Sequence, residues 1–245
     1  MSKLRPDGHT VVALVATSTI LPALKPDLGF DLLKDLAPVS LTTRRTFVLT
    51  AWPGLPANNV LELIAYAKAN PGKVAWSTAG IGSGLHMAGE WLNSAAGIDM
   101  TMVHYKGSAA AEVDMQAGRV HVTPKALSSA QAFIRSKKLK IIGIATAARS
   151  PLFSDVKTVA EQGFAGYDYP GWFGMMTTGG TPPAILNRLS AGFRFAVNTP
   201  AALKSWEEQG TLPVGSTPEE FRTMLTAEME LWKKLVKVNN IKSED

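Results

Sequence analysis

The sequence of 245 residues contains no cysteine. A disulfide framework, a thiolate metal site and a cysteine nucleophile are therefore excluded, and no redox compartment is favoured. Charged residues are also sparse, at 18% of the chain against 46% hydrophobic residues, which excludes a disordered, highly charged chain. The sequence therefore predicts a globular protein with a substantial core, built as one large domain or two small ones.

Long apolar runs and an extended basic stripe are missing as well. The longest apolar stretch, residues 10–24, is interrupted by Pro22 and falls short of the roughly 20 residues of a membrane helix. The net charge is +5, but the basic residues are scattered and form no stripe of the kind that binds nucleic acid. We therefore expect no nucleic-acid partner and a weak preference for small anions.

Short β-branched runs alternate with segments of helical spacing along most of the chain. The expected strands cover residues 10–16, 45–50, 73–77, 100–105, 119–123, 139–145 and 167–176. Helices are expected between most of them, beginning with one capped by Asn59, and three more helices close the chain. This alternation favours an α/β fold whose mainly parallel sheets are flanked by helices.

Two segments near the start have a different character. Residues 10–16 are mainly apolar at both the odd and the even positions, which predicts a strand buried on both faces of a sheet. Residues 22–38 are rich in proline and aspartate and are expected to form a loop.

A glycine-rich loop, residues 80–84 (GIGSG), lies between an expected strand and an expected helix. Glycines let backbone N–H groups turn toward an anion, and the helix N-terminus adds partial positive charge. The spacing departs from the dinucleotide fingerprint G-x-G-x-x-G, and Asp99 stands at the start of the next strand rather than at its end. A carboxylate or phosphate site, a tight turn without a ligand, and an NAD(P)-dependent oxidoreductase remain as alternatives.

A second turn repeats this geometry after the strand 100–105, where Lys106, Gly107 and Ser108 open an alanine-rich helix. The carboxyl ends of parallel strands in one sheet open onto the same crevice, so the two turns together predict a cradle for a small anion. Ser108 as a simple helix cap and Lys106 as a solvated charge are the alternatives.

The four histidines show no metal-binding spacing, so neither a metal nor another cofactor is expected. His86 lies on the first turn of the helix that follows the glycine loop, where it orients the loop, contacts a ligand or packs the helix. Ser83 lacks the G-x-S-x-G spacing of a nucleophile elbow. We therefore assign no catalytic residue, and an anion cradle without catalytic groups favours a binding protein over an enzyme.

A series of ordered motifs carries a resemblance to a known family. The motifs are PDGHT (6–10), DLAPVS (35–40), AKANPGK (67–73), STAGIGSGLH (77–86), AGE (88–90), HYKGS (104–108), RSP (149–151), TVAE (158–161), GWFG (171–174) and GTP (180–182). Over essentially the whole chain they resemble the Bug receptors, which are TctC-like extracytoplasmic solute-binding proteins of tripartite tricarboxylate transporters.

The resemblance implies a two-lobed fold like that of type II periplasmic binding proteins, closing by a hinge on a small carboxylate. Lobe 1 would combine residues 1–50 with 170–245, and lobe 2 would span 51–169. The receptor would be a periplasmic monomer that delivers an organic anion to membrane permease subunits, without catalysis or a cofactor.

The resemblance also implies ligand contacts at three loops, made largely by backbone amides and small hydroxyl residues. The residues that match are Thr17, Ser18 and Thr19 in the first loop, Ala79, Gly80, Ile81, Gly82 and Ser83 with His86 in the second, and Gly107, Ser108 and Ala109 in the third.

The start of the chain departs from the family pattern. The signal peptide and the first strand, helix and strand have no counterpart, so lobe 1 is expected to be incomplete. If the start is authentic, we expect a cytoplasmic protein with an unpaired sheet edge, low solubility and little ligand binding.

A second departure lies in the expected strand near residue 123, where relatives often carry an aspartate and this chain has Thr123, Pro124 and Lys125. The reversed charge at Lys125 predicts that ligand amines are disfavoured and that an additional ligand carboxylate is preferred. A lysine that points to solvent is the alternative.

Overall fold

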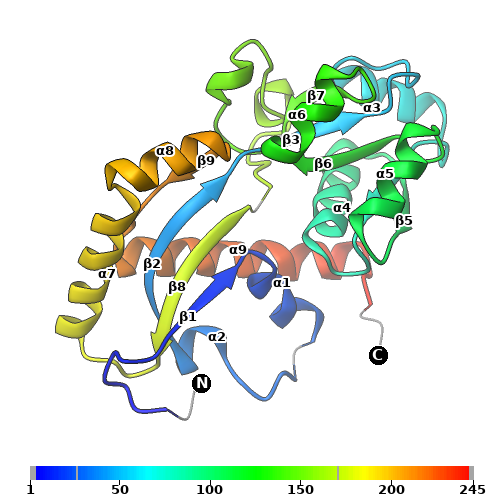
Figure 1. The fold of residues 1–245 in the computed structure, drawn as a ribbon. Coiled ribbons are helices and arrows are strands. Elements are labelled where there is room, and N and C mark those ends of the chain that lie inside the picture. The colour runs from blue at the N-terminus through cyan, green and yellow to red at the C-terminus, as the bar shows by residue number, and fades with distance from the viewer. Residues whose placement is uncertain (1–3, 26, 170, 243–245) are drawn as a thin grey trace. The chain divides into compact units, whose positions relative to one another are not determined.

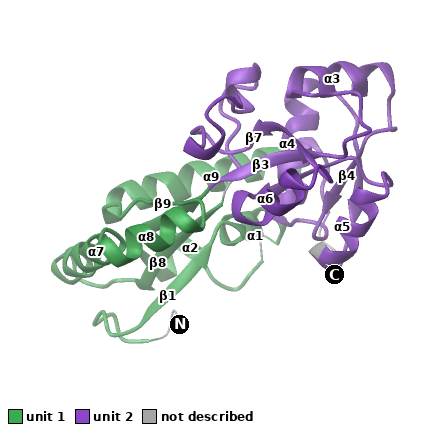
Figure 2. Cartoon of the chain, turned by 45° about the horizontal axis from the view of Figure 1, so that its top comes forward, with its two compact units in different colours: residues 1–45, 171–237 green, residues 46–170, 238–245 purple. Residues whose placement is uncertain are grey.

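The computed structural model describes residues 4–25, 27–169 and 171–242. The chain divides into two compact units, coloured separately in Figure 2. Unit 1 contains residues 1–45 and 171–237, and unit 2 contains residues 46–170 and 238–245. The chain thus passes between the units at 45/46 and 170/171, against the expected 50 and 170, and residues 238–245 group with unit 2.

Unit 1 is built on a four-stranded sheet in the order β1-β8-β2-β9 (Figure 1). Its strands are β1 (Val11–Val15), β2 (Leu36–Arg45), β8 (Trp172–Thr178) and β9 (Thr211–Pro213). Its helices are α1 (Thr17–Leu24), α2 (Leu32–Asp35), α7 (Pro183–Val197), α8 (Pro200–Glu208) and α9 (Pro218–Val238). Every strand pair in this sheet is antiparallel.

The core of unit 1 forms between β8 and α9. Trp172 and Met176 of β8 are buried against Phe221 and Leu225 of α9, and the Trp172 and Phe221 rings meet edge to face at 5.5 Å. A Cβ atom at Gly174 would lie 2.1 Å from the Phe221 ring, so this ring packs directly on the backbone of β8. Glycine at this position therefore sets how closely α9 approaches the sheet.

A buried polar network ties α1 to the same core. The Glu228 carboxylate accepts hydrogen bonds from the Trp172 indole and from the Thr19 hydroxyl, each at 3.0 Å. The Trp232 indole donates to the Thr19 oxygen at 3.1 Å, and Thr19 is fully buried. Packing and this network hold α1 in place although Pro22 removes one of its backbone donors.

Unit 2 is built on a five-stranded sheet in the order β5-β4-β6-β3-β7. Its strands are β3 (Phe47–Ala51), β4 (Ala75–Thr78), β5 (Thr101–His104), β6 (Val122–Ala126) and β7 (Lys140–Ile144). Its helices are α3 (Val60–Ala69), α4 (Gly84–Ala96), α5 (Ser108–Gln116) and α6 (Leu127–Arg135), with short 3-10 turns at Pro151–Phe153 and Ala160–Gln162. Strand β4 runs parallel to β5 and β6, whereas β3 is antiparallel to β6 and β7.

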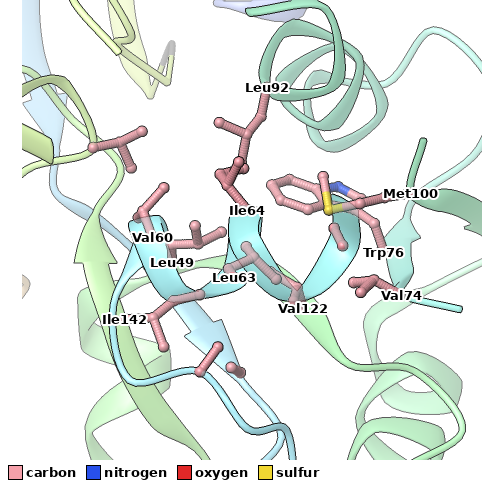
Figure 3. Close-up of a cluster of buried hydrophobic side chains, with 14 of the residues drawn as sticks. Leu49, Val60, Leu63, Ile64, Val74, Trp76, Leu92, Met100, Val122 and Ile142 are labelled. Atoms are coloured by element: carbon pink, nitrogen blue, oxygen red, sulfur yellow. The ribbon is translucent and has the colours of Figure 1, made fainter. Parts of the chain in front are cut away.

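The core of unit 2 is a cluster of buried aliphatic and aromatic side chains (Figure 3). It includes Leu49, Val60, Leu63, Ile64, Val74, Trp76, Leu92, Met100, Val122 and Ile142. Helix α3 contributes the positions three and four residues apart that the sequence predicts for its buried face. Trp76 is fully buried, and its indole donates to the Leu85 carbonyl at 2.9 Å, which fixes α4 against β4.

The helix starts predicted from capping residues are confirmed. Asn59 accepts a hydrogen bond from the Glu62 amide, and Thr199 caps α8. Thr217 and Glu220 form a reciprocal capping box at the start of α9, with amide contacts of 2.8 and 3.2 Å. Such caps contribute about 1 kcal/mol each, which explains why the sequence places these boundaries well.

The α/β class is confirmed, but the strand directions differ from the expected mainly parallel sheets. In unit 1, β2 precedes the passage of the chain into unit 2 and β8 follows its return, and these two strands are antiparallel. The parallel pairs of unit 2 are those whose strands are linked by helices α4 and α5.

Three local expectations for the start of the chain were wrong. Strand β1 is only partly buried and pairs with β8 along one side within the described residues, so it is an edge strand there. Thr17 to Thr19 begin α1 instead of forming a loop, and the expected loop 22–38 contains α2 and the start of β2. For α1 and α2, packing in the core of unit 1 outweighs the local signals of proline and aspartate. Across the described residues, no helix has both the length and the apolar character that crossing a bilayer requires.

His121 joins the start of β4 to the start of β6. Its Nδ1 accepts a hydrogen bond from the Ala75 amide at 2.9 Å, and its own amide donates to the Ala75 carbonyl at 2.9 Å. Burial lowers the pKa of His121 below its ordinary 6.5. We predict that the free energy of unfolding falls as the pH drops below about 6.5, because the unfolded chain then binds a proton that the folded chain resists.

The measurement is urea unfolding followed by circular dichroism at about pH 7.5 and about pH 5.5. His121→Asn keeps a short acceptor but does not titrate, so it should lose less stability between the two pH values than the wild type. An equal loss in both proteins would contradict the assignment.

Candidate functional site

A cavity of about 240 Å³ lies in unit 2 at the carboxyl ends of β4 and β6. Its lining comes from the end of β4 (Ser77, Thr78, Ala79), from Gly107 and α5 (Ala111, Glu112, Met115), from β6 (Thr123, Pro124, Lys125, Ala126), and from Phe47, Leu85, Ser129 and Tyr169. Parallel pairing places the ends of β4, β5 and β6 at one edge of the sheet, where α/β proteins bind ligands.

The glycine loop at this edge has an unusual backbone. Gly80 and Gly82 have φ angles of +107° and +73°, which favour glycine. The Gly80 amide donates to the Thr78 hydroxyl at 3.2 Å, and the Ser83 amide donates to the Gly80 carbonyl at 3.2 Å. Among the described residues, the amides of Ala79 and Ile81 have no acceptor, so they are available to an anion.

The His86 side chain supports the backbone of this loop through a hydrogen bond. Its Nδ1 accepts a hydrogen bond from the Gly82 amide at 3.0 Å, so the ring carries its proton on Nε2, which lies 3.5 Å from a Glu90 oxygen. The Ser83 hydroxyl caps α4 by accepting from the His86 amide. His86 is buried, and this geometry is that of a residue that orients the loop. A direct ligand contact by His86 stays a prediction.

Thr78 and His104 end the neighbouring strands β4 and β5. The β4–β5 register pairs them, and the Thr78 hydroxyl lies 2.6 Å from His104 Nδ1. Because the same hydroxyl oxygen receives the Gly80 amide, Thr78 links the end of β5 to the glycine loop. The His104 ring also meets the His86 ring edge to face at 5.0 Å.

The second turn leads from β5 into α5. Gly107 is the N-cap of α5 and has no side chain to accept a hydrogen bond, so the first-turn amides are left to solvent or a ligand. Lys106 is exposed, as expected for a solvated charge. Ser108 begins the helix, but its side chain lies outside what the structure describes.

A hydrogen-bonded cluster of Tyr105, Asp114 and Arg119 lies at this turn. The Tyr105 hydroxyl donates to an Asp114 oxygen at 2.7 Å, and the Arg119 guanidinium binds the other Asp114 oxygen. Burial and the Asp114 contact raise the pKa of Tyr105 to about 12. The hydrogen bonds from Tyr105 and Arg119 hold the pKa of the Asp114 carboxyl below its usual range. This cluster thus fixes α5 against the end of β5.

Lys125 does not point to solvent, so that alternative was wrong. Its side chain is 9% exposed, and its Nζ lies 2.5 Å from a Glu112 oxygen of α5. The ammonium also lies 5.1 Å from the centre of the Phe133 ring. The lysine therefore reaches the cavity as half of an ion pair rather than as a single charge.

The structure brings together part of the predicted site. Ala79, Gly107 and Lys125 line one cavity, and Gly80 to Ser83 continue from Ala79. Ala109 is exposed on the first turn of α5. Thr17, Ser18 and Thr19 belong to unit 1, where the Thr19 hydroxyl is used by Glu228 and Trp232.

Sequence reasoning missed the residues that surround the turns. Thr78, Tyr105 and Glu112 are adjacent to or near the two glycine turns, but their roles depend on partners from other elements. Phe47 and Tyr169, whose rings lie 4.4 Å apart, come from distant parts of unit 2. Thr78 and Tyr105 had a local signal, because each stands at or next to the end of a strand that leads into a glycine turn. Within the described ranges, no group of three His, Asp or Glu residues could hold a metal ion.

The two-unit α/β fold, with an anion-suited cavity at the ends of parallel strands, is that of a solute-binding protein. Residues 1–241 match the profile of the tripartite tricarboxylate transporter family receptor. The chain belongs to this family, and the resemblance to the Bug receptors is confirmed. BugT of Bordetella pertussis (strain Tohama I) is 30% identical over 98% of this chain and 74% of its own length.

Solved structures agree with this assignment. A structure described as a periplasmic transporter is 32% identical, with a TM-score of 0.80 over 98% of this chain and 81% of its own. A protein of R. palustris with adipate is 27% identical (TM-score 0.76, 98% and 81% covered). MatC of Rhodopseudomonas palustris with bound malate is 26% identical (TM-score 0.75, 96% and 81% covered). The oxidoreductase alternative receives no support from these relatives.

The loop backbone yields a test of its own. A methyl group at Gly80 would meet no atom within 4 Å, so Gly80→Ala introduces backbone strain alone. We predict that it lowers the free energy of unfolding by about 1–2 kcal/mol. Gly107→Ala is the matched control, because it also has open space but an extended φ of 175°. Urea unfolding should show a clearly smaller loss for Gly107→Ala, and equal losses would argue against strain at Gly80.

Proposed function

We propose that this chain is the solute-binding receptor of a tripartite tricarboxylate transporter and that it binds a small organic carboxylate in the cavity of unit 2. The observation that carries the proposal is the convergence of Ala79 and Gly107, from two turns 28 residues apart in sequence, on one cavity. Two similar receptors of known structure carry malate and adipate, which are both carboxylates.

The donors at this cavity suit reversible binding of an anion. Amides of the glycine loop and the uncapped first turn of α5 offer N–H groups, and Ser77 and Ser129 are among the lining residues. Charge-assisted hydrogen bonds from neutral donors satisfy a carboxylate without a second buried charge. The positive end of α5 adds to the attraction.

Binding without chemical change is the second part of the proposal. The contact between Thr78 and His104 pairs a hydroxyl with an imidazole, as in a nucleophile and its general base. Thr78 is only 2% exposed, however, and its oxygen also accepts a hydrogen bond from the Gly80 amide. Its position is that of a brace for the glycine loop. We therefore assign no catalytic residue to the cavity.

The partners follow from the family. We propose that the receptor works as a periplasmic monomer that hands its ligand to the permease subunits of its transporter. A neighbour described as a periplasmic transporter supports the location. We propose further that units 1 and 2 are the two lobes of the receptor. Thr17 is exposed and Ser18 half-buried at the start of α1, so both remain candidates for ligand contact from unit 1.

Thermal unfolding in the presence of a panel of carboxylates tests the proposal. A ligand that binds only the folded chain stabilises it by about 2.7 kcal/mol at 100 times its dissociation constant. At least one carboxylate should raise the melting temperature, and NAD should leave it unchanged. A shift with NAD alone would favour the oxidoreductase, and a folded protein that no carboxylate stabilises would contradict the receptor.

A further inference from the structure

The cavity contains a complete ion pair of its own. Lys125 of β6 and Glu112 of α5 both line it, with 2.5 Å between Nζ and the nearer carboxylate oxygen. The Lys125 side chain is 9% exposed and the Glu112 side chain 28% exposed. Because the two charges are opposite and in contact, this part of the cavity has no net charge.

The surroundings of the pair are apolar. Phe47, Met115, Pro124 and Tyr169 line the cavity with the pair, and Phe133 lies against the lysine ammonium. Glu112 follows the start of α5 by about one helical turn, or roughly 5.4 Å. A ligand whose carboxylate binds at the first turn of α5 and whose body enters the cavity would lie along the pair and these apolar side chains.

We infer that the ligand is a monocarboxylate whose other end is uncharged and apolar, and that Glu112 together with Lys125 determines this selectivity. The inference rests on the proposed function, because it takes a carboxylate as the group held by the turns. It narrows the ligand class beyond the dicarboxylates malate and adipate that the similar receptors carry.

The physical reason is that a balanced ion pair rejects both signs of charge. A second ligand carboxylate could reach Lys125 only beside the Glu112 carboxylate, and a ligand ammonium could reach Glu112 only beside the Lys125 ammonium. Separating the pair to admit either group would leave one partly buried charge unpaired, which is costly. Selectivity thus comes from what the pair repels, while the apolar walls supply attraction.

This differs from the expectation that reversed charge at Lys125 favours an additional ligand carboxylate. That expectation considered Lys125 by itself. Glu112 lies 13 residues earlier in the chain, and its contact with Lys125 cancels the positive charge. Because the pair has no net charge, Glu112 does not repel the ligand carboxylate that binds at the turns.

The test compares three six-carbon ligands that differ only at the far end: hexanoate, adipate and ω-aminohexanoate. Isothermal titration calorimetry on the full chain should give the tightest binding for hexanoate. Glu112→Gln frees the lysine charge and should improve adipate relative to hexanoate by about tenfold. Lys125→Met frees the glutamate charge and should instead improve ω-aminohexanoate relative to hexanoate. Each variant is thus the control for the other.

The outcomes separate this inference from the proposed function. Adipate binding to the wild type at least as tightly as hexanoate would overturn the inference and leave the carboxylate receptor intact. Hexanol binding as well as hexanoate, or no carboxylate binding at all, would overturn both. If a variant fails to fold, the order of the three ligands on the wild type still decides the inference.

Discussion

The parallel pairing of β4 with β5 and β6 is the constraint on which the rest of unit 2 depends. It fixes Thr78 opposite His104 and brings the end of β6 alongside, so two glycine turns and Lys125 meet at one edge of the sheet. Helices α4 and α5 make these parallel connections, and their N-termini therefore open at the same edge. The cavity is a direct result of this topology.

Buried polar groups then give the turns their shape. His86 and Thr78 receive the amides of Gly82 and Gly80 from the inside, which leaves the amides of Ala79 and Ile81 without an acceptor in the described structure. A backbone that satisfies only some of its donors internally is suited to an anion that satisfies the others. In unit 1, by contrast, buried polar groups serve stability, since the Glu228 carboxylate accepts hydrogen bonds from Thr19 and Trp172 in the core.

Much of the fold could be predicted because its signals are local. The spacing of α3, the caps at Asn59 and Thr217 and the left-handed Gly97 that ends α4 each act within one or two helical turns. The start of the chain could not be predicted in the same way. Helix α1 contains Pro22 and forms through packing with α9, which follows it by some 200 residues in the sequence. The antiparallel sheet of unit 1 likewise reflects how the chain returns from residue 170 onward.

By itself, the sequence determined the alternation of strands and helices, the two glycine turns and the membership of a receptor family, because these depend on neighbouring residues and ordered motifs. Only the tertiary structure decided which side chains face the cavity. The pairing of Lys125 with Glu112 is the clearest case, because it joins a residue of β6 to a residue of α5 and balances the charge that the lysine has by itself. Charge in a cavity is a sum over all the elements that line it, and a linear motif contains only one of them.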